Sequence, residues 1–169
     1  MSPLHFRAPW SRSLKTRTAM GVLLLIAFEV VILLIDLTQP LRFLIAAVPP
    51  FALIASVAQG IRGYVLTEGE LQILRWGWIT RVPLTDLRDA EGKAGAIQYS
   101  IRIFANRGLL AFTGFYWSRE LKLFRAFATD DSRSVVLRFE RKRVVVSPHD
   151  PQQFIVRTRT MLKNRQFPM

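Results

Sequence analysis

Residues 19–37 read AMGVLLLIAFEVVILLIDL, and residues 41–59 read LRFLIAAVPPFALIASVAQ. Thirteen residues of the first run are Val, Ile, Leu or Phe, and nine residues of the second run are of these types. A helix of about nineteen residues is roughly 28 Å long, close to the roughly 30 Å hydrocarbon core of a bilayer. Residues 38–40 leave room only for a tight turn between the runs. The sequence therefore predicts a transmembrane helical hairpin over residues 19–59.

One acid and two prolines interrupt this hairpin. An ionised acid at the centre of a membrane helix costs about 2.5–3.5 kcal/mol, whereas the apolar residues of the first run contribute roughly −4 to −8 kcal/mol, so this run should insert despite Glu29. Pro49 and Pro50 lack backbone donors and predict a kink or break. Glu29 and the proline pair have two readings, an ion or proton relay or a purely structural role. Because no second acid lies at the same depth, we favour a carboxyl that packs against the second helix or against a second copy of the chain.

The charge of the chain divides it into three parts. The chain carries 24 Lys and Arg against 12 Asp and Glu, a net charge of +12. Residues 1–18 hold four basic and no acidic side chains, and most other basic residues follow residue 59. Cytoplasmic loops of membrane proteins are enriched in Lys and Arg. We therefore expect a basic cytoplasmic N-terminal segment (1–18), the hairpin (19–59) and a cytoplasmic domain (60–169), with both termini in the cytoplasm.

Beyond residue 60 the sequence changes to the pattern of short strands. Residues 64–67 and 70–76 flank the turn Glu68-Gly69, and residues 135–139 alternate apolar with polar side chains. A further strand is expected over residues 121–129, where Arg125 falls in phase with Leu123 and Phe127, which allows a β-bulge. About seven strands are expected in all.

A helix should follow the last strand. Asp150 is suited to be its N-cap, and Pro151 is suited to its first position. Phe154, Ile155, Thr158, Met161 and Leu162 then recur at helical spacing. This pattern predicts an α+β domain in which the helix packs on a β core.

These residues resemble a known family, the bacterial pleckstrin-homology (PH-like) domain proteins. The resemblance runs from about residue 63 to residue 162 and is carried by residues 64–71, 82–87, 124–129 and 146–151. It implies a PH-like barrel of about seven antiparallel strands, capped by the C-terminal helix, and a binding or assembly module without catalytic activity. At Lys122, just before the third of these stretches, the resemblance leads us to expect a glycine.

Few residues suggest chemistry. The chain has no cysteine, and it contains no Walker loop, dinucleotide-binding glycine motif or His-Glu-x-x-His motif. His149 next to Asp150 is interpreted as a surface turn residue. We therefore predict no catalytic residue, no metal site and no cofactor.

One segment could form an interaction surface. Basic side chains flank its aromatic residues, which suits contact with anionic lipid headgroups or stacking on single-stranded nucleic acid. Alternatively, the aromatic side chains fill the barrel and the basic ones form a solvated rim. The candidate residues are Arg107, Phe115, Tyr116, Trp117, Arg119, Lys122 and Arg125. The predicted membrane anchor favours lipid over nucleic acid. The first hairpin loop, residues 67–70, is acidic, so recognition of inositol lipids is not carried over from the fold.

The sequence thus predicts a module of the bacterial cytoplasmic (inner) membrane that is multi-pass, non-catalytic and active in binding, scaffolding or assembly. Its expected partners are the lipid bilayer and another membrane or cytoplasmic protein, including a second copy of the chain. The alternative hypothesis is a small transport or ion-conducting subunit whose working part is the hairpin with Glu29.

Overall fold

The computed structural model describes residues 3–35, 38–107 and 110–166, with side chains given for these residues except 105–107 and 165–166. Four helices and ten strands lie in this part of the chain, together with one short 3-10 helix, Asp131–Arg133. The helices are α1 (Arg12–Leu34), α2 (Gln39–Ala46), α3 (Val48–Gln59) and α4 (Pro151–Gln166). The strands are β1 (Leu4–Arg7), β2 (Ile61–Leu66), β3 (Glu70–Arg75), β4 (Ile79–Pro83), β5 (Leu87–Gly92), β6 (Ile101–Arg107), β7 (Phe112–Ser118), β8 (Lys122–Ala128), β9 (Val135–Phe139) and β10 (Arg143–Val146).

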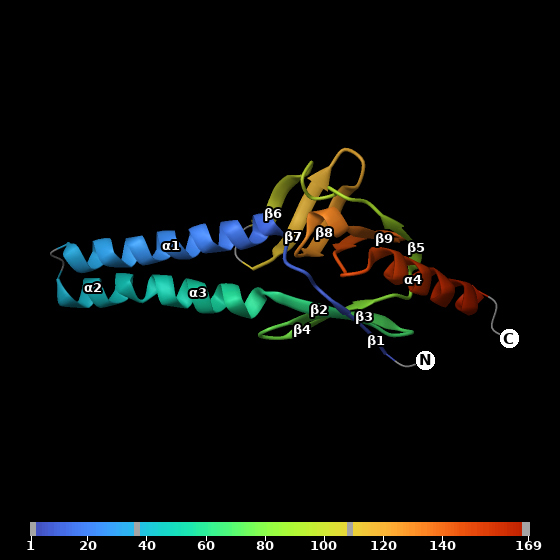
Figure 1. The fold of residues 1–169 in the computed structure, drawn as a ribbon, viewed down its shortest axis with the longest axis horizontal. Coiled ribbons are helices and arrows are strands. Elements are labelled where there is room, and N and C mark those ends of the chain that lie inside the picture. The colour runs from blue at the N-terminus through green and yellow to red at the C-terminus, as the bar shows by residue number, and fades with distance from the viewer. Residues whose placement is uncertain (1–2, 36–37, 108–109, 167–169) are drawn as a thin grey trace.

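Helices α1, α2 and α3 form a long arm that projects from the β part of the molecule, with α1 lying beside α2 and α3 (Figure 1). The helix α1 begins at Arg12, earlier than the predicted residue 19, because Ser11 caps it by accepting a hydrogen bond from the Leu14 amide at 3.1 Å. The predicted break at the proline pair is present as a single residue, Ala47, between α2 and α3. Pro49 and Pro50 lie in the first turn of α3, where a missing amide costs little.

The turn between the two helical segments of the arm begins earlier than predicted, since α1 ends at Leu34 and α2 begins at Gln39. Gln39 and Pro40, which the sequence analysis placed in the turn, already belong to the first turn of α2. Asp36 and Leu37 lie outside the described residues. Proline is favoured at such a position because its φ suits the helix and its missing amide has no partner there.

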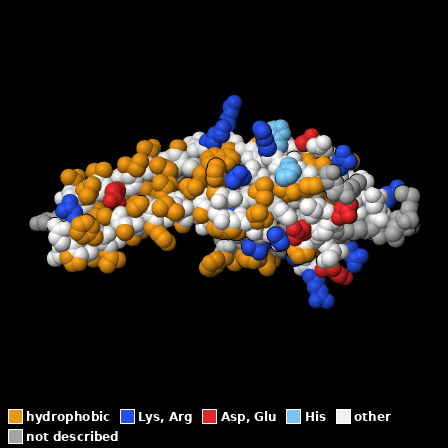
Figure 2. All heavy atoms as spheres, turned by 90° about the horizontal axis from the view of Figure 1, so that it is seen from below, with side chains coloured by type: hydrophobic (Ala, Val, Ile, Leu, Met, Phe, Trp, Pro, Cys, Tyr) orange, Lys and Arg blue, Asp and Glu red, His pale blue; other side chains and the backbone are white. Residues whose placement is uncertain are grey.

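The arm exposes most of its apolar side chains. Leu34, Phe43 and Phe51 are 73–80% exposed. In the most apolar 18-residue stretch of each of its two long helical segments, only 6% and 11% of the stretch is buried. Figure 2 shows hydrophobic side chains covering the arm, whereas most Lys and Arg side chains in that view lie on the β part. Both segments, residues 12–34 and 39–59, are long and apolar enough to cross a membrane by length and composition.

The strands form two open sheets instead of the expected closed barrel. The first sheet has the order β1-β2-β3-β4, and the second has the order β5-β9-β10-β8-β7-β6. No strand of one sheet pairs with a strand of the other among the described residues. The pairing is not wholly antiparallel either, because β10 lies parallel to β8. The barrel of about seven antiparallel strands is therefore wrong in closure, in strand number and in one strand direction.

The C-terminal helix is confirmed as predicted. Asp150 accepts a hydrogen bond from the Gln153 amide at 2.9 Å, which caps the start of α4. Phe154, Thr158 and Met161 are buried on one face of the helix. The ring of Phe154 packs edge-on against Phe6 of β1, with 5.1 Å between the ring centroids. The helix α4 thus covers the main core at the end of the molecule opposite the arm (Figure 1).

The sequence analysis did not identify strand β1, which joins the N-terminal segment to the first sheet. It pairs antiparallel with β2, and Arg7 lies opposite Gly63. This approach is close: a Cβ added at Gly63 would lie 2.7 Å from the backbone oxygen of Phe6. Only glycine allows the two strands to pair at this position without displacement.

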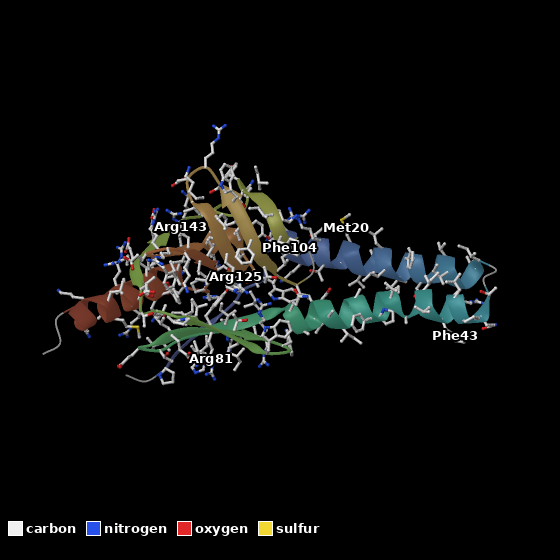
Figure 3. The ribbon with its side chains drawn as sticks, turned by 180° about the vertical axis from the view of Figure 1, so that it is seen from behind. Met20, Phe43, Arg81, Phe104, Arg125 and Arg143 are labelled. Carbon is white, nitrogen blue, oxygen red and sulfur yellow. The ribbon has the colours of Figure 1, made fainter. Side chains whose placement is uncertain are left out.

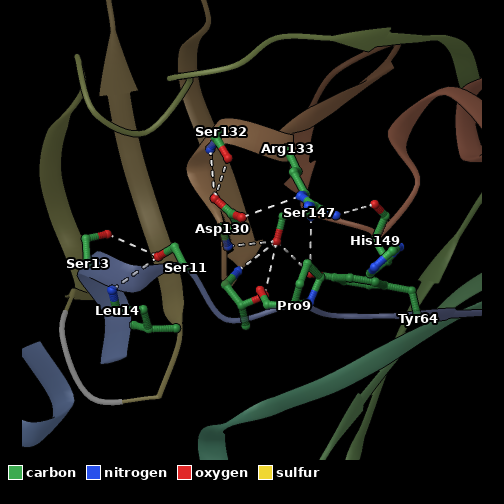
Figure 4. A network of polar contacts seen from close by, with 11 residues as sticks. Pro9, Ser11, Ser13, Leu14, Tyr64, Asp130, Ser132, Arg133, Ser147 and His149 are labelled. Atoms are coloured by element: carbon green, nitrogen blue, oxygen red, sulfur yellow. Dashed lines mark hydrogen bonds and ion pairs between the residues drawn. The ribbon is translucent and has the colours of Figure 1, made fainter. Parts of the chain in front are cut away.

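A buried polar network then holds the segment that leads from β1 to α1 (Figure 4). The hydroxyl of Tyr64 donates to the carbonyl of Phe127 at 2.7 Å and accepts from the amide of Ser147 at 3.2 Å. The hydroxyl of Ser147 accepts from the amide of Thr129 at 2.8 Å, and the hydroxyl of Thr129 donates to the carbonyl of Pro9 at 2.7 Å. The network therefore links both sheets to the residues just before α1.

We expect Gly63→Ala to destabilise the protein by about 1–3 kcal/mol, because the added methyl group forces β1 away from β2. Gly69→Ala is the matched control, since a Cβ there meets no heavy atom within 4 Å. Equilibrium unfolding of the detergent-solubilised chain measures both variants. Equal stability of the two variants would contradict the close pairing of β1.

Tyr64 predicts a loss of stability at alkaline pH. Burial raises its pKa from 10.0 to about 12, although its hydrogen bonds with Ser147 oppose the shift. The folded state keeps a proton that the unfolded state releases above pH 10, so this contribution is complete below pH 10 and is lost between pH 10 and 12. We expect the wild-type protein to lose up to roughly 2–3 kcal/mol more than Tyr64→Phe across this interval. Denaturant unfolding at a series of pH values from 9 upward measures the stability of both proteins. An equal change in stability of the two proteins with pH would show that Tyr64 does not titrate in this way.

Candidate functional site

A groove lies between the two open sheets, next to the point where the arm enters the β part. Its volume is about 660 Å³. Strands from both sheets and the last residue of α3 line it: Gln59, Arg75, Trp78, Thr80, Arg102, Ile103, Phe104, Thr113, Gly114, Arg125 and Phe127. We call this hollow the arginine groove, because three arginines and no acidic residue line it.

Arg75 lies deepest among the three arginines and is only 8% exposed. Its Nη1 donates to the carbonyl of Gln59 at 3.2 Å, but its buried Nε has no hydrogen-bond partner among the described residues. The guanidinium carbon lies 5.2 Å from the ring centroid of Trp78 and 5.3 Å from that of Phe127. Burial lowers the pKa of Arg75 and the charge of Arg125 lowers it further, while Tyr64 raises it.

Arg125 and Arg102 add two more guanidinium groups from the second sheet. Arg125 of β8 lies over Phe127, 4.7 Å from its ring centroid, and reaches Phe115 at 5.5 Å. Arg102 comes from β6 and is exposed. None of the three arginines forms a salt bridge with a carboxylate in the described part of the chain. The groove therefore carries positive charge that the described residues do not neutralise.

Hydrogen bonds between the β3–β4 turn and the end of α3 position one wall of the groove. In the turn between β3 and β4, Gly77 donates its amide to the carbonyl of Ala58 at 3.0 Å, and Trp76 donates to Gly60 at 3.2 Å. These bonds satisfy carbonyls at the end of α3, which a helix leaves without intrahelical partners. The turn consequently holds Trp76 and Trp78 beside the end of the arm.

Apolar side chains form the rim of the groove. Phe104 is 84% exposed, Ile103 is 55% exposed and Trp78 is 47% exposed. A β-bulge in β6 between Arg102 and Phe104 interrupts the alternation of side chains, so three consecutive residues line the groove. In Figure 3, Arg125 lies in the middle of the β part, Phe104 lies toward the arm and Arg143 toward the opposite end.

A second, smaller hollow continues from the first along the gap between the sheets. Its volume is about 290 Å³, and Arg125 and Phe127 line both hollows. Four further basic residues line it: Arg81, Arg141, Lys142 and Arg143. Arg81 lies 3.9 Å from Glu70, and Arg143 donates to the carbonyl of Leu121 at 2.8 Å. Basic side chains therefore follow the gap between the sheets over both hollows.

The model of a family described as "Bacterial PH domain" matches residues 62–161, more than half of the chain. The chain belongs to the bacterial PH domain family. Comparisons with curated proteins and with solved structures gave no match. Membership indicates a binding or scaffolding module, and the resemblance drawn from residues 64–71, 82–87, 124–129 and 146–151 is confirmed.

The predicted interaction surface of this bacterial PH domain does not lie on a single face. Tyr116 is fully buried and stacks on Phe124 in the core of the second sheet. Phe115 is 43% exposed and Trp117 is half-buried, while Arg119 and Lys122 are exposed near the turn between β7 and β8. Of the candidate side chains, Arg125 lines the arginine groove, and the side chain of Arg107 lies outside the described residues.

The sequence analysis missed Arg75 and Arg102 as residues of the groove. A signal for Arg75 was present, because it follows the inward-facing Leu71 and Ile73 at a spacing of two residues in β3. Arg125 shows the same pattern in phase with Phe127, and its register with β7 is continuous, so the β-bulge considered there is absent. An arginine two residues away from a buried apolar residue of the same strand is thus the common signal. Arg102 gave no such signal, because the β-bulge beside it depends on pairing between β6 and β7.

Glu29 lies beside the proline pair in this PH domain protein. One of its oxygens, Oε2, is buried without a hydrogen-bond partner among the described residues. A cavity of about 310 Å³ between α1 and α3 holds Glu29, Pro49 and Pro50 with apolar neighbours. Neither the family nor a single carboxyl supports the transport hypothesis.

Lys122 has a backbone φ of 52°, in the left-handed region that favours glycine. This conformation explains why the family resemblance leads us to expect a glycine there. A residue with a Cβ atom costs about 1–2 kcal/mol in this region. Glycine avoids that cost, but it also makes the unfolded chain more flexible, which offsets part of the stabilisation. We therefore expect Lys122→Gly to be about 0.5–1 kcal/mol more stable than Lys122→Ala, which removes the same charge but keeps Cβ. Unfolding of the two variants under one condition checks this order, and a more stable alanine variant would contradict it.

Proposed function

We propose that this protein is a non-catalytic binding, scaffolding or assembly module held at the cytoplasmic face of the bacterial inner membrane. In this proposal α1 crosses the membrane outward, and α2 with α3 crosses it back. The bacterial PH domain then lies at the membrane surface, where it binds lipid and a membrane or cytoplasmic protein. A second copy of the chain is one candidate for that protein.

The observation that carries the proposal is the unburied apolar arm. In water, exposed patches of apolar side chains beyond a few hundred Å² are rare on soluble monomers. Both helical segments of the arm expose almost their whole apolar length, and the other described residues leave them uncovered. A bilayer is the surrounding that suits two such helices of membrane-spanning length.

The distribution of charge supports the proposed orientation. Arg12, Lys15 and Arg17 lie at the base of α1, and Arg62 follows the end of α3 in β2. The far end of the arm holds Arg42, which donates to the carbonyl of Leu33 at 2.6 Å. Because basic residues favour the cytoplasmic side, the base of the arm and the β part belong there.

The arrangement of the β part supports binding without supporting catalysis. His149 is exposed, and its backbone bonds to Arg7 and Arg133. Asp131 accepts hydrogen bonds from the amides of Ile97 and Gln98 at 2.9 and 2.7 Å, so its carboxylate organises a loop. The arginine groove, by contrast, leaves charged donors facing a hollow of ligand size.

A topology experiment tests the proposal. Alkaline phosphatase fused after Gln39 should be active, because the turn of the arm lies outside the cytoplasm, and the same enzyme fused after Met169 should be inactive. Full-length protein in membranes should also resist extraction by alkaline carbonate. Release by carbonate would contradict the anchor, and active enzyme at Met169 with inactive enzyme at Gln39 would contradict the orientation.

A further inference from the structure

We propose that the arginine groove binds the phosphate group of an anionic phospholipid from the membrane leaflet in which the arm is anchored. This inference rests on the proposed function, since it places the mouth of the groove at the membrane surface. It assigns that lipid a defined binding site instead of a general attraction to basic residues.

Charge is the first argument. Arg75, Arg102 and Arg125 face one hollow from both sheets, and no carboxylate of the described residues neutralises them. Arg102 and Arg125 are exposed, but Arg75 is buried, and burying its charge without a partner costs free energy. A phosphate in the groove would supply the missing counter-charge, and guanidinium groups bind phosphate through paired, directional hydrogen bonds.

The orphan donor of Arg75 is the second argument. Its Nε–H is buried and has no acceptor in the described part of the chain, although its Nη1 is fixed by the carbonyl of Gln59. The stacking of the guanidinium with Trp78 and Phe127 holds the group in a defined orientation. One nitrogen is thus used to hold the side chain, and another is left to bind an acceptor that enters the groove.

The rim identifies an amphipathic ligand. A free anion needs only the polar floor, whereas Trp78, Ile103 and Phe104 surround the mouth with exposed apolar surface. Gln59, the last residue of α3, also lines the groove, so the mouth lies where the proposed membrane helix ends. Aromatic side chains are favoured at that level of a bilayer. A phosphate on the floor with acyl chains beyond the rim matches this distribution.

The site differs from the first hairpin loop, where the acidic residues Glu68 and Glu70 flank Gly69. Those carboxylates repel an anionic headgroup. The groove lies at the other end of β3, where residues of β3 and β4 face residues of β6, β7 and β8. The binding site therefore lies between the two sheets and away from the acidic loop.

Titration of the full chain in a neutral detergent tests the inference without requiring a membrane. The probes are dihexanoyl phosphatidylglycerol, dihexanoyl phosphatidylcholine, inorganic phosphate and a single-stranded oligonucleotide, and the readouts are calorimetry and tryptophan fluorescence, since Trp78 lines the groove. We expect phosphatidylglycerol to bind at least tenfold more tightly than each of the other three. Arg102→Gln and Arg125→Gln should each weaken that binding about tenfold. Arg157→Gln, which removes an exposed arginine from α4, should leave it unchanged.

The remaining outcomes overturn the inference. Equal affinity for inorganic phosphate would reject a lipid as the occupant, and tighter binding of the oligonucleotide would make nucleic acid the ligand. Equal affinity of all three variants would show that the lipid binds outside the groove. Because these measurements use detergent-solubilised protein, failure here leaves the topology experiment to decide on the anchor separately.

Discussion

The hydrogen bonds at the end of α3 are the constraint on which the rest of the structure depends. Carbonyls at a helix end are left without partners, and here the amide of Gly77 and the guanidinium of Arg75 bind those of Ala58 and Gln59. A positive group at a helix C-terminus also interacts favourably with the helix dipole. Because β2 begins at Ile61, directly after this junction, the direction of the arm is fixed to that of the first sheet.

A separate set of contacts holds the start of α1. Thr129 and Tyr64 bind through Ser147 and tie the segment around Pro9 to both sheets, while Leu14 of α1 is buried in the core of the second sheet. Within the arm, α3 is thus attached to the first sheet, and α1 packs on the core of the second sheet. The helices of the arm and the polar network join the two sheets at one end, and α4 covers the main core at the other end. The arginine groove can therefore stay open although the sheets are held together.

Local patterns predicted much of this fold and little of the groove. The apolar runs predicted both helical segments of the arm. Asp150 and Pro151 predicted the start of α4, and the alternation of apolar and polar residues predicted strands such as β9. The open sheets, the parallel β8–β10 pair and strand β1 depend on pairing between distant segments, such as Phe6 with Tyr64, which periodicity cannot reveal. For the groove, the sequence indicated Arg125 as an arginine in phase with Phe127 of the core, but the role of Arg75 depends on the placement of β3 opposite β8.

Arg75 is a charged residue at a position of β3 that the strand pattern assigns to a buried apolar side chain. On an inward strand face an apolar residue would bury at no electrostatic cost, whereas this guanidinium is buried near the like charge of Arg125. Its bond to Gln59 and its stacking with Trp78 explain how it is held, but a neutral donor could cap a helix end as well. A sequence that departs from local consistency in this way commonly does so at a functional site. The burial of this charge next to Arg125, together with the unpaired Nε, is therefore the feature that the proposed phosphate would explain.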